Sequence, residues 1–228
     1  MISIIVPAWN EEEALEGVVA ELRAELPDAE IVLVDDGSDD KTGEICAGME
    51  AAHNVECVFL EKNKGKGEAF ARGIEKSRGT EIVLFESDGQ YDAGDVKRAV
   101  DALDTYDVVN GIRVERVEGG WRKWSSQIFT LVQARVFSVK VMDVNSGLKA
   151  FRRDAAEKLF SKEMLGQFNK ERAYHRFVLA VAVSLGYSIG QVPVSHRKRR
   201  GGKSYISLWR TPLSTFATFI RLLIWKLS

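Results

Sequence analysis

The sequence predicts one α/β domain with a mainly parallel β-sheet and helices on both of its faces. Short runs rich in Ile and Val alternate with segments of helical periodicity, as in the strand–helix–strand repeats of parallel sheets. The chain has 228 residues, of which 45% are hydrophobic and 29% charged, so it is long enough to bury one full core. No linker, repeat or low-complexity segment divides it.

In the first half of the chain, apolar runs predict buried strands at 2–7, 30–34, 55–60, 81–85 and 107–109. Between the first two strands, one helical face carries Leu15, Val18, Val19, Leu22 and Leu26. Further helices are expected at about 41–52, 67–77 and 94–104.

The second half has a different pattern. A helix is predicted over 121–140, where Trp121, Trp124, Ile128 and Leu131 form one stripe. The segments that follow predict a turn into a strand at 143–153, a helix at 171–185, a last strand at 188–194 and a basic loop at 195–204. We therefore expect a main domain over residues 1–204 and a separate tail over 205–228.

The tail predicts an amphipathic helix, with Leu213, Phe216, Ile220, Leu223 and Leu227 at helical spacing. Its longest uncharged stretch, 211–220, is too short to span a bilayer. Such a helix either packs on the core or lies in a membrane interface, where its flanking basic residues favour anionic lipid.

The formal net charge of −1 hides an asymmetry. Residues 1–50 hold 14 acidic and 2 basic side chains, whereas residues 187–228 hold 8 basic and no acidic ones. This distribution suggests a cation site near the first end and an anionic partner near the second. Two cysteines outside any C-x-x-C motif indicate a reducing compartment, and three widely spaced histidines argue against a zinc cluster.

Polar side chains follow three of the predicted strands, at 7–11, 35–38 and 86–90. Ligands of parallel α/β sheets bind beyond the carboxyl ends of the strands. Carboxylates gathered there repel one another unless a cation lies among them, and a hard divalent ion prefers oxygen ligands. Each cluster alone is also typical of turns and helix caps, so the prediction depends on the three occurring together.

Eight motifs in order carry a resemblance to a known family: VPAWNE (6–11), VDDGS (34–38), NKGKGEAFARG (63–73), ESDGQYD (86–92), NGIR (110–113), DVNSGLKAFRR (143–153), HRF (175–177) and VPVSHRKRRGGKSY (192–205). The sequence resembles the family-2 glycosyltransferases of the GT-A (Rossmann-like) fold. Within them it is similar to the polyprenyl-phosphate glycosyltransferases, the group that includes dolichol-phosphate mannose synthase. The resemblance covers about residues 2–205.

The resemblance implies a nucleotide-sugar site at the first strand ends. The residues implied to hold the nucleotide sugar are Pro7, Ala8, Asn10, Glu11, Asp35, Asp36, Lys66, Glu86 and Ser87. The family's Asp-x-Asp motif corresponds to Glu86-Ser87-Asp88 and implies Mg²⁺ or Mn²⁺, with Gln90 as a further ligand. Glu86 departs from the family's aspartate, and its extra methylene shifts the carboxylate, so Asp88 and Gln90 are the stronger candidates for the metal.

The resemblance also implies which residues meet the two phosphate groups. Arg113 and Arg199 are expected at phosphates and, with Asp88, form the predicted catalytic set. For the acceptor phosphate we expect Arg122, Lys203 and Ser204, although the lysine is displaced relative to the family's Arg-x-x-Gly-x-Ser-Lys pattern. A lipid phosphate is largely ionised at pH 7, so it needs positioning more than a general base. His175 and His196 are expected to be structural.

The resulting hypothesis is inverting transfer of a hexose from a UDP- or GDP-linked sugar to a dolichyl or undecaprenyl phosphate, by a protein bound peripherally to the cytoplasmic side of the membrane. Two alternatives stay open: a transferase of the same fold that uses a soluble or glycan acceptor, and an inactive relative that only binds the donor. A nucleic-acid binder built on the basic run 197–200 would leave the acidic strand ends unexplained, so we expect no nucleic-acid partner.

Overall fold

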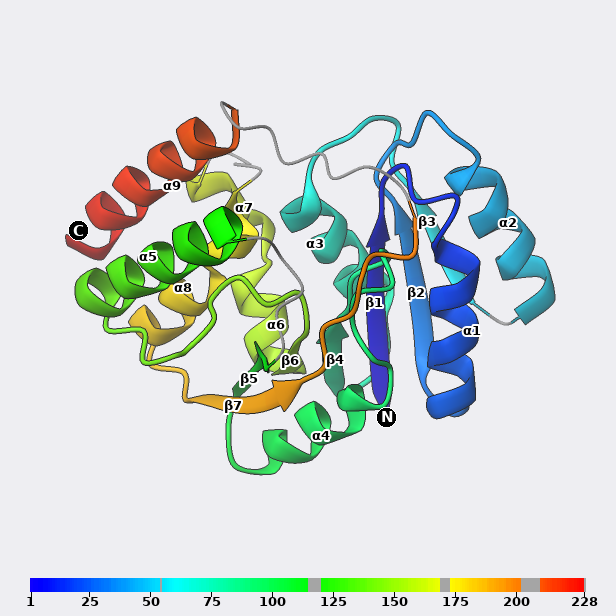
Figure 1. Cartoon of the computed structure of the whole chain (residues 1–228), viewed down its shortest axis with the longest axis horizontal. Helices are drawn as coiled ribbons and strands as arrows, with labels where there is room; N and C mark the ends of the chain where they lie inside the picture. Colours follow the sequence, from blue (N-terminus) through cyan, green and yellow to red (C-terminus); the bar gives the residue numbers. More distant parts are fainter. Residues whose placement is uncertain (54, 115–119, 169–172, 202–209, 228) are drawn as a thin grey trace.

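The computed structural model describes residues 1–53, 55–114, 120–168, 173–201 and 210–227, with the side chains of 51–53, 120–123, 210–213 and 227 left out. Seven strands form one sheet in the order β3-β2-β1-β4-β6-β5-β7 (Figure 1). Their bounds are β1 Ile2–Ala8, β2 Glu30–Asp35, β3 Glu56–Phe59, β4 Glu81–Leu84, β5 Val108–Arg113, β6 Lys149–Arg152 and β7 Ile189–Val194. All strand pairs are parallel except those that β6 makes with β4 and β5, which confirms the predicted mainly parallel sheet.

The helices cover both faces of the sheet. The α-helices are α1 Leu15–Glu25, α2 Thr42–His53, α3 Lys66–Lys76, α4 Asp95–Asp101, α5 Gly120–Phe137, α6 Arg153–Leu159, α7 Lys162–Gln167, α8 Val178–Ser184 and α9 Arg210–Leu227. Two short 3₁₀ helices, η1 Ala102–Asp104 and η2 Tyr174–Arg176, complete the described elements. The predicted helix at 171–185 is thus shorter than expected in its described part, because it consists of η2 and α8.

The core has two halves, one on each face of the sheet. Successive residues of a strand point to opposite faces, so Ile4 and Val6 pack with α1, α2 and α4, while Ile5 packs with α3, α6 and α8. Burial on both faces explains why the strands are continuous apolar runs. Gly73 lets α3 approach β1 closely, because a Cβ atom there would lie 2.2 Å from Cγ2 of Ile5.

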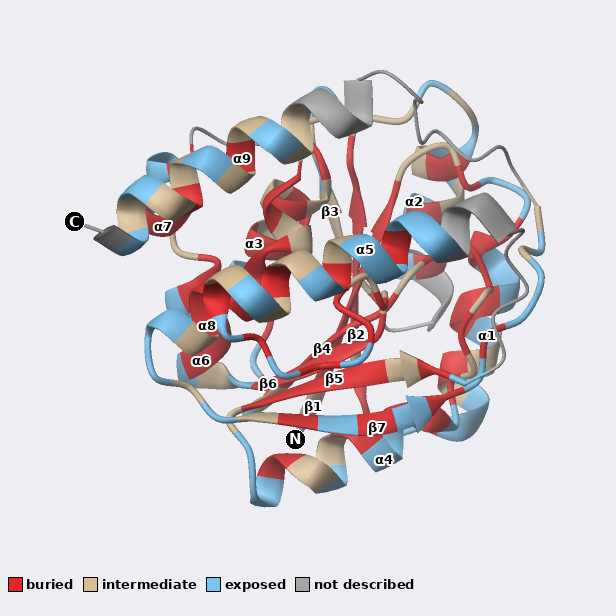
Figure 2. Cartoon of the chain, turned by 60° about the vertical axis from the view of Figure 1, so that its left-hand side comes forward, coloured by how far each residue is buried: buried red, intermediate tan, exposed pale blue. Residues whose placement is uncertain are grey.

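The described part of the tail is α9, which packs on the domain by one face only. Leu222 is fully buried, and the Phe219 ring contacts the Phe137 ring of α5 with centroids 5.5 Å apart. The opposite face leaves Phe216 and Ile224 exposed (Figure 2). One face of this helix therefore packs on the core, and the other face is exposed. None of the described helices combines the length and the apolar character needed to cross a membrane.

Candidate active site

The polar strand ends converge at one edge of the sheet, where β1, β2 and β4 finish side by side (Figure 1). The loops after β1 and β2 are joined by hydrogen bonds: the Asn10 amide donates to Ser38 Oγ over 3.0 Å, and the Asp39 amide donates to Asn10 Oδ1 over 2.9 Å. The Ser87 hydroxyl after β4 donates to the Pro7 carbonyl over 2.8 Å. The three polar strand ends are thus joined in one hydrogen-bonded frame.

Asp35 and Asp36 organise the loops of this frame. Oδ1 of Asp35 accepts hydrogen bonds from the amide and the hydroxyl of Ser38, at 3.1 and 2.5 Å. The Asp36 carboxylate accepts from the amides of Lys64 and Gly65, at 2.7 and 2.8 Å. The second contact fixes the loop that leads into α3, so these carboxylates shape the site whether or not they also touch a nucleotide.

Arg199 lies between two buried carboxylates. Its guanidinium pairs with Oε1 of Glu11 and lies 3.6 Å from Oδ2 of Asp88. Burial raises the pKa of Glu11 to about 7, despite the opposing charge of Arg199. Burial, followed by the charge of Glu86, raises the pKa of Asp88 to about 6. Within the described part of the chain, Oε2 of Glu11 is buried without a hydrogen-bond partner.

Glu86 contacts Lys66. Oε1 of Glu86 is 2.5 Å from Nζ of Lys66. Burial alone would raise the pKa of Glu86, but the charge and hydrogen bond of Lys66 outweigh it and hold the pKa at about 2. Lys66 is the first residue of α3, so its backbone position depends on the loop that Asp36 fixes.

Arg113 is engaged inside the protein. Its Nε and Nη2 atoms donate to the two carboxylate oxygens of Asp143 over 2.7 and 3.0 Å, and both side chains are buried. This geometry differs from the expected direct contact with a phosphate, because the arginine fork already holds a carboxylate. Arg113 still affects the site, because its charge helps to lower the pKa of Glu86. This effect is smaller than those of burial and of Lys66.

The basic loop after β7 crosses the end of β4. The Arg197 amide donates to the Gln90 carbonyl over 2.7 Å, and the Arg200 amide donates to the Asp88 carbonyl over 3.1 Å. The Gln90 side-chain amide donates back to the Arg197 carbonyl over 3.2 Å. These contacts place Arg199 in the site. Lys203 and Ser204 lie outside the described residues, as does the side chain of Arg122 on α5.

The donor set fits a divalent cation at Asp88. In the described ranges no three His, Cys, Asp or Glu side chains are gathered as a ready metal cluster. However, Glu11 and Asp88 share one arginine, and the orphaned Oε2 atom of Glu11 is an oxygen donor of the kind that Mg²⁺ and Mn²⁺ prefer. Glu86 fits this role less well, because Lys66 already neutralises it.

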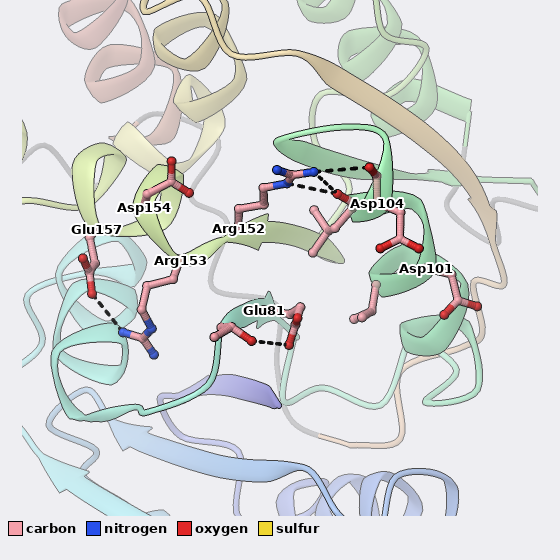
Figure 3. A pocket seen from close by; sticks show the side chains of 10 residues that line it. Glu81, Asp101, Asp104, Arg152, Arg153, Asp154 and Glu157 are labelled. Atoms are coloured by element: carbon pink, nitrogen blue, oxygen red, sulfur yellow. Dashed lines mark hydrogen bonds and ion pairs between the residues drawn. The ribbon is translucent and has the colours of Figure 1, made fainter.

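Another polar pocket lies at the opposite end of the sheet, at the first residue of β4, Glu81 (Figure 3). Its two arginines have structural partners. Arg152 donates to the Leu103 carbonyl over 3.0 and 2.8 Å, and Arg153 pairs with Glu157 over 3.0 Å. Because parallel α/β sheets bind ligands at the carboxyl ends of their strands, we place the active site at Asp88 instead.

Several residues near the site had no role assigned from sequence, and all but Tyr91 lie in the DVNSGLKAFRR motif. Asp143 binds Arg113, and the Gly147 amide donates to the Tyr91 hydroxyl over 2.6 Å. The Lys149 ammonium donates to the Ser146 carbonyl, and burial lowers its pKa to about 8. The buried charge at Lys149 was detectable in the sequence as a single lysine in an apolar strand pattern.

Comparison with known proteins agrees with this geometry. The family described as "Glycosyl transferase family 2" matches residues 3–160. The undecaprenyl-phosphate 4-deoxy-4-formamido-L-arabinose transferase of Pseudomonas aeruginosa (strain LESB58) is 32% identical over 217 residues, which cover 92% of this chain. The enzyme of the same name from Pseudomonas paraeruginosa (strain DSM 24068 / PA7) is 30% identical over 217 residues, with the same coverage. The chain spans 61% of the length of each of these relatives.

A solved structure is similar over nearly the whole chain. Glucosyl-3-phosphoglycerate synthase from Mycobacterium tuberculosis, in complex with Mn²⁺, UDP and glucosyl-3-phosphoglycerate, aligns with a TM-score of 0.70 and 22% identity. The alignment covers 98% of this chain and 80% of that one. This likeness confirms the predicted GT-A fold. The match over residues 3–160 places this chain in glycosyl transferase family 2.

Proposed function

We propose that this protein transfers a sugar from a nucleoside-diphosphate sugar to a polyprenyl phosphate, with inversion at the anomeric carbon. The observation that carries the proposal is the meeting of Asp88, Lys66 and Arg199 at the carboxyl ends of the parallel strands. A donor diphosphate and an acceptor phosphate are both anionic, so a site that joins them needs cations beside its metal-binding carboxylate. The names of the family relatives, undecaprenyl-phosphate sugar transferases, support the choice of acceptor.

In this proposal the frame around β1 and β2 binds the nucleotide. The residues that we assign to the nucleotide part are Pro7, Ala8, Asn10, Glu11, Asp35 and Asp36, with Ser87 supporting Pro7. Asp88, assisted by Gln90, would hold Mg²⁺ or Mn²⁺, and the solved relative in complex with UDP and Mn²⁺ supports a divalent ion of this class. The ion, when bound, stabilises negative charge on the departing diphosphate.

The protein's own residues contribute by positioning the two substrates and by stabilising charge. A phosphate oxygen of the acceptor forms a bond to the anomeric carbon as the bond to the nucleoside diphosphate breaks, which inverts the configuration. Lys66 and Arg199 face the charge that develops on the leaving group, and the charge of Arg113 acts on Glu86. An ionised phosphate attacks without prior proton removal, so the site needs no general base.

Two helices supply the surface that we assign to the membrane. The outward stripe of α5 exposes Trp124 and Leu131, and that of α9 exposes Phe216, Ile220 and Ile224 (Figure 2). The two helices contact each other through the rings of Phe137 on α5 and Phe219 on α9. Exposed aromatic and aliphatic side chains on amphipathic helices favour insertion into a lipid interface. We propose peripheral binding at the cytoplasmic face, with Arg122, Lys203 and Ser204 near the acceptor phosphate.

The test is transfer of radiolabel into an organic-extractable product. UDP-glucose, UDP-N-acetylglucosamine and GDP-mannose are supplied separately with undecaprenyl phosphate and either Mg²⁺ or Mn²⁺. We expect label in the lipid phase with one donor, and loss of that label with EDTA and in Asp88→Ala. Label that stays in the aqueous phase with every donor and both metal ions, while the protein still binds a donor, would favour the inactive relative or the soluble acceptor.

A further inference from the structure

We propose that Glu86 is a positioning residue whose carboxylate holds the Lys66 ammonium at the donor diphosphate, in place of the metal-binding role of the aspartate that it replaces. This inference rests on the proposed function. Its first support is the 2.5 Å contact between Oε1 of Glu86 and Nζ of Lys66. A lysine ammonium has three N–H donors, and this contact uses one of them. Among the described residues the Lys66 ammonium makes one hydrogen bond, the one to Glu86, and the side chain as a whole is 36% exposed.

The second support is the way Glu86 is packed. A Cβ atom on Gly147 would lie only 2.2 Å from the carboxyl carbon of Glu86, so the glycine leaves the space that this side chain fills. Gly147 is held in place by its hydrogen bond to the Tyr91 hydroxyl. An aspartate at position 86 would end about one C–C bond, roughly 1.5 Å, short of the same point. The glutamate is therefore the length that this contact with Lys66 requires.

The third support is the division of charge in the site. Lys66 contacts Glu86 directly. Asp88 and Glu11 instead lie on either side of Arg199. A divalent ion placed at the Glu86 oxygen that Lys66 contacts would have to displace the ammonium, whereas Oε2 of Glu11 is a buried carboxylate oxygen without a hydrogen-bond partner in the described part of the chain. Glu86 and Asp88 thus differ in the cation that each contacts directly, Lys66 for Glu86 and Arg199 for Asp88.

A double-mutant cycle on donor affinity tests the proposal. UDP-glucose and GDP-mannose are each titrated by calorimetry into the full chain in the presence of Mg²⁺, with the native protein, Glu86→Gln, Lys66→Met and the double variant. We expect each single variant to weaken donor binding about tenfold, as the loss of a charged hydrogen bond does, and the double variant to bind no more weakly than Lys66→Met. Thermal unfolding shows that each variant is folded.

Two further variants test the length of the side chain at position 86 and provide a control on the same helix. Glu86→Asp restores the family's aspartate, yet we expect it to weaken donor binding as Glu86→Gln does, because its carboxylate falls short of Lys66. Glu75→Gln removes an ion pair that the same helix makes with Arg72 at the surface, and we expect donor affinity to stay unchanged. A rise in the KM for the donor, with a smaller change in kcat in the transfer assay, is expected for Glu86→Gln.

Other outcomes would overturn the proposal. Losses that add in the double variant would mean that Glu86 and Lys66 act independently. Tighter donor binding or faster transfer by Glu86→Asp would make position 86 a metal ligand. If the native protein transfers label to lipid from none of the three donors of the transfer assay, the proposed function fails and this inference fails with it, whereas additive losses in an active enzyme overturn this inference alone.

Discussion

Arg113 and Asp143 form a two-point ion pair in the interior of the protein, with N···O distances of 2.7 and 3.0 Å. The pair joins the end of β5 to the loop before β6. Only 6% of the Arg113 side chain and 3% of the Asp143 side chain are exposed, so neither charge has water to replace its partner. This pair links the stability of the fold to the electrostatics of the site.

Removing one member of the Arg113–Asp143 pair should destabilise the folded protein. Asp143→Ala removes the carboxylate that binds the buried Arg113 charge at two points, and we expect the free energy of unfolding to fall by about 3–5 kcal/mol. Asp143→Asn retains one acceptor oxygen and should lose less. Urea denaturation measures both. A loss below about 1 kcal/mol in the alanine variant, within the range of exposed ion pairs, would show that the pair is not buried in solution.

The stability of the protein without ligand should depend on the protonation of Glu11. Burial raises the pKa of this side chain from 4.5 to about 7, so the folded state binds a proton that the unfolded chain releases. The stabilisation is complete below about pH 4.5 and is lost as the pH rises through about 7. The Tm of Glu11→Gln minus that of the native protein should therefore rise across this interval. A difference that stays flat from pH 4 to pH 8 would refute the assigned burial.

Arg199 should contribute more to turnover than Lys198, its neighbour in the same loop. Arg199→Met removes the cation between Glu11 and Asp88, and we expect kcat in the transfer assay to fall about 100-fold, as for the loss of one group that stabilises a transition-state charge. Lys198→Met changes an exposed residue of the same loop and serves as the control. Equal losses in the two variants would assign the effect to the loop as a whole.

The outward face of α9 should contribute to membrane binding. Changing Phe216, Ile220 and Ile224 together to serine removes three exposed apolar side chains, and we expect binding to phosphatidylglycerol vesicles to weaken at least about tenfold. Phe59→Ser, which alters an exposed apolar residue on β3, should leave flotation unchanged. If the triple variant floats like the native protein, α9 does not face the membrane.

The parallel part of the sheet could be predicted from sequence because its strands are buried on both faces and therefore appear as continuous Ile- and Val-rich runs. The helices α6 and α7 were not predicted. They are only 7 and 6 residues long, and such short helices depend on tertiary packing for their stability. The local signal of α7 was a cap, since the Ser161 side chain accepts a hydrogen bond from the Met164 amide, whereas α6 has no side-chain cap.

The composition of the candidate site could be predicted, but its pairings could not. The motifs placed Glu86, Asp88, Lys66 and Arg199 at one edge of the sheet, where the structure has them. Which acid meets which base depends on side-chain length and on contacts between distant segments. Asp143 reaches Arg113 from 30 positions away, and Gly147 makes room for Glu86, relationships that no local pattern contains.

The most direct test of the central claim is a competition between two acceptors in one reaction. The protein receives labelled donor, Mn²⁺, and equal concentrations of undecaprenyl phosphate and 3-phosphoglycerate, and the label in the organic and aqueous products is counted. We predict that label enters the lipid and that Asp88→Ala abolishes it. Label found only in glucosylated phosphoglycerate would contradict the proposed acceptor and identify the chain as a transferase for soluble phosphates.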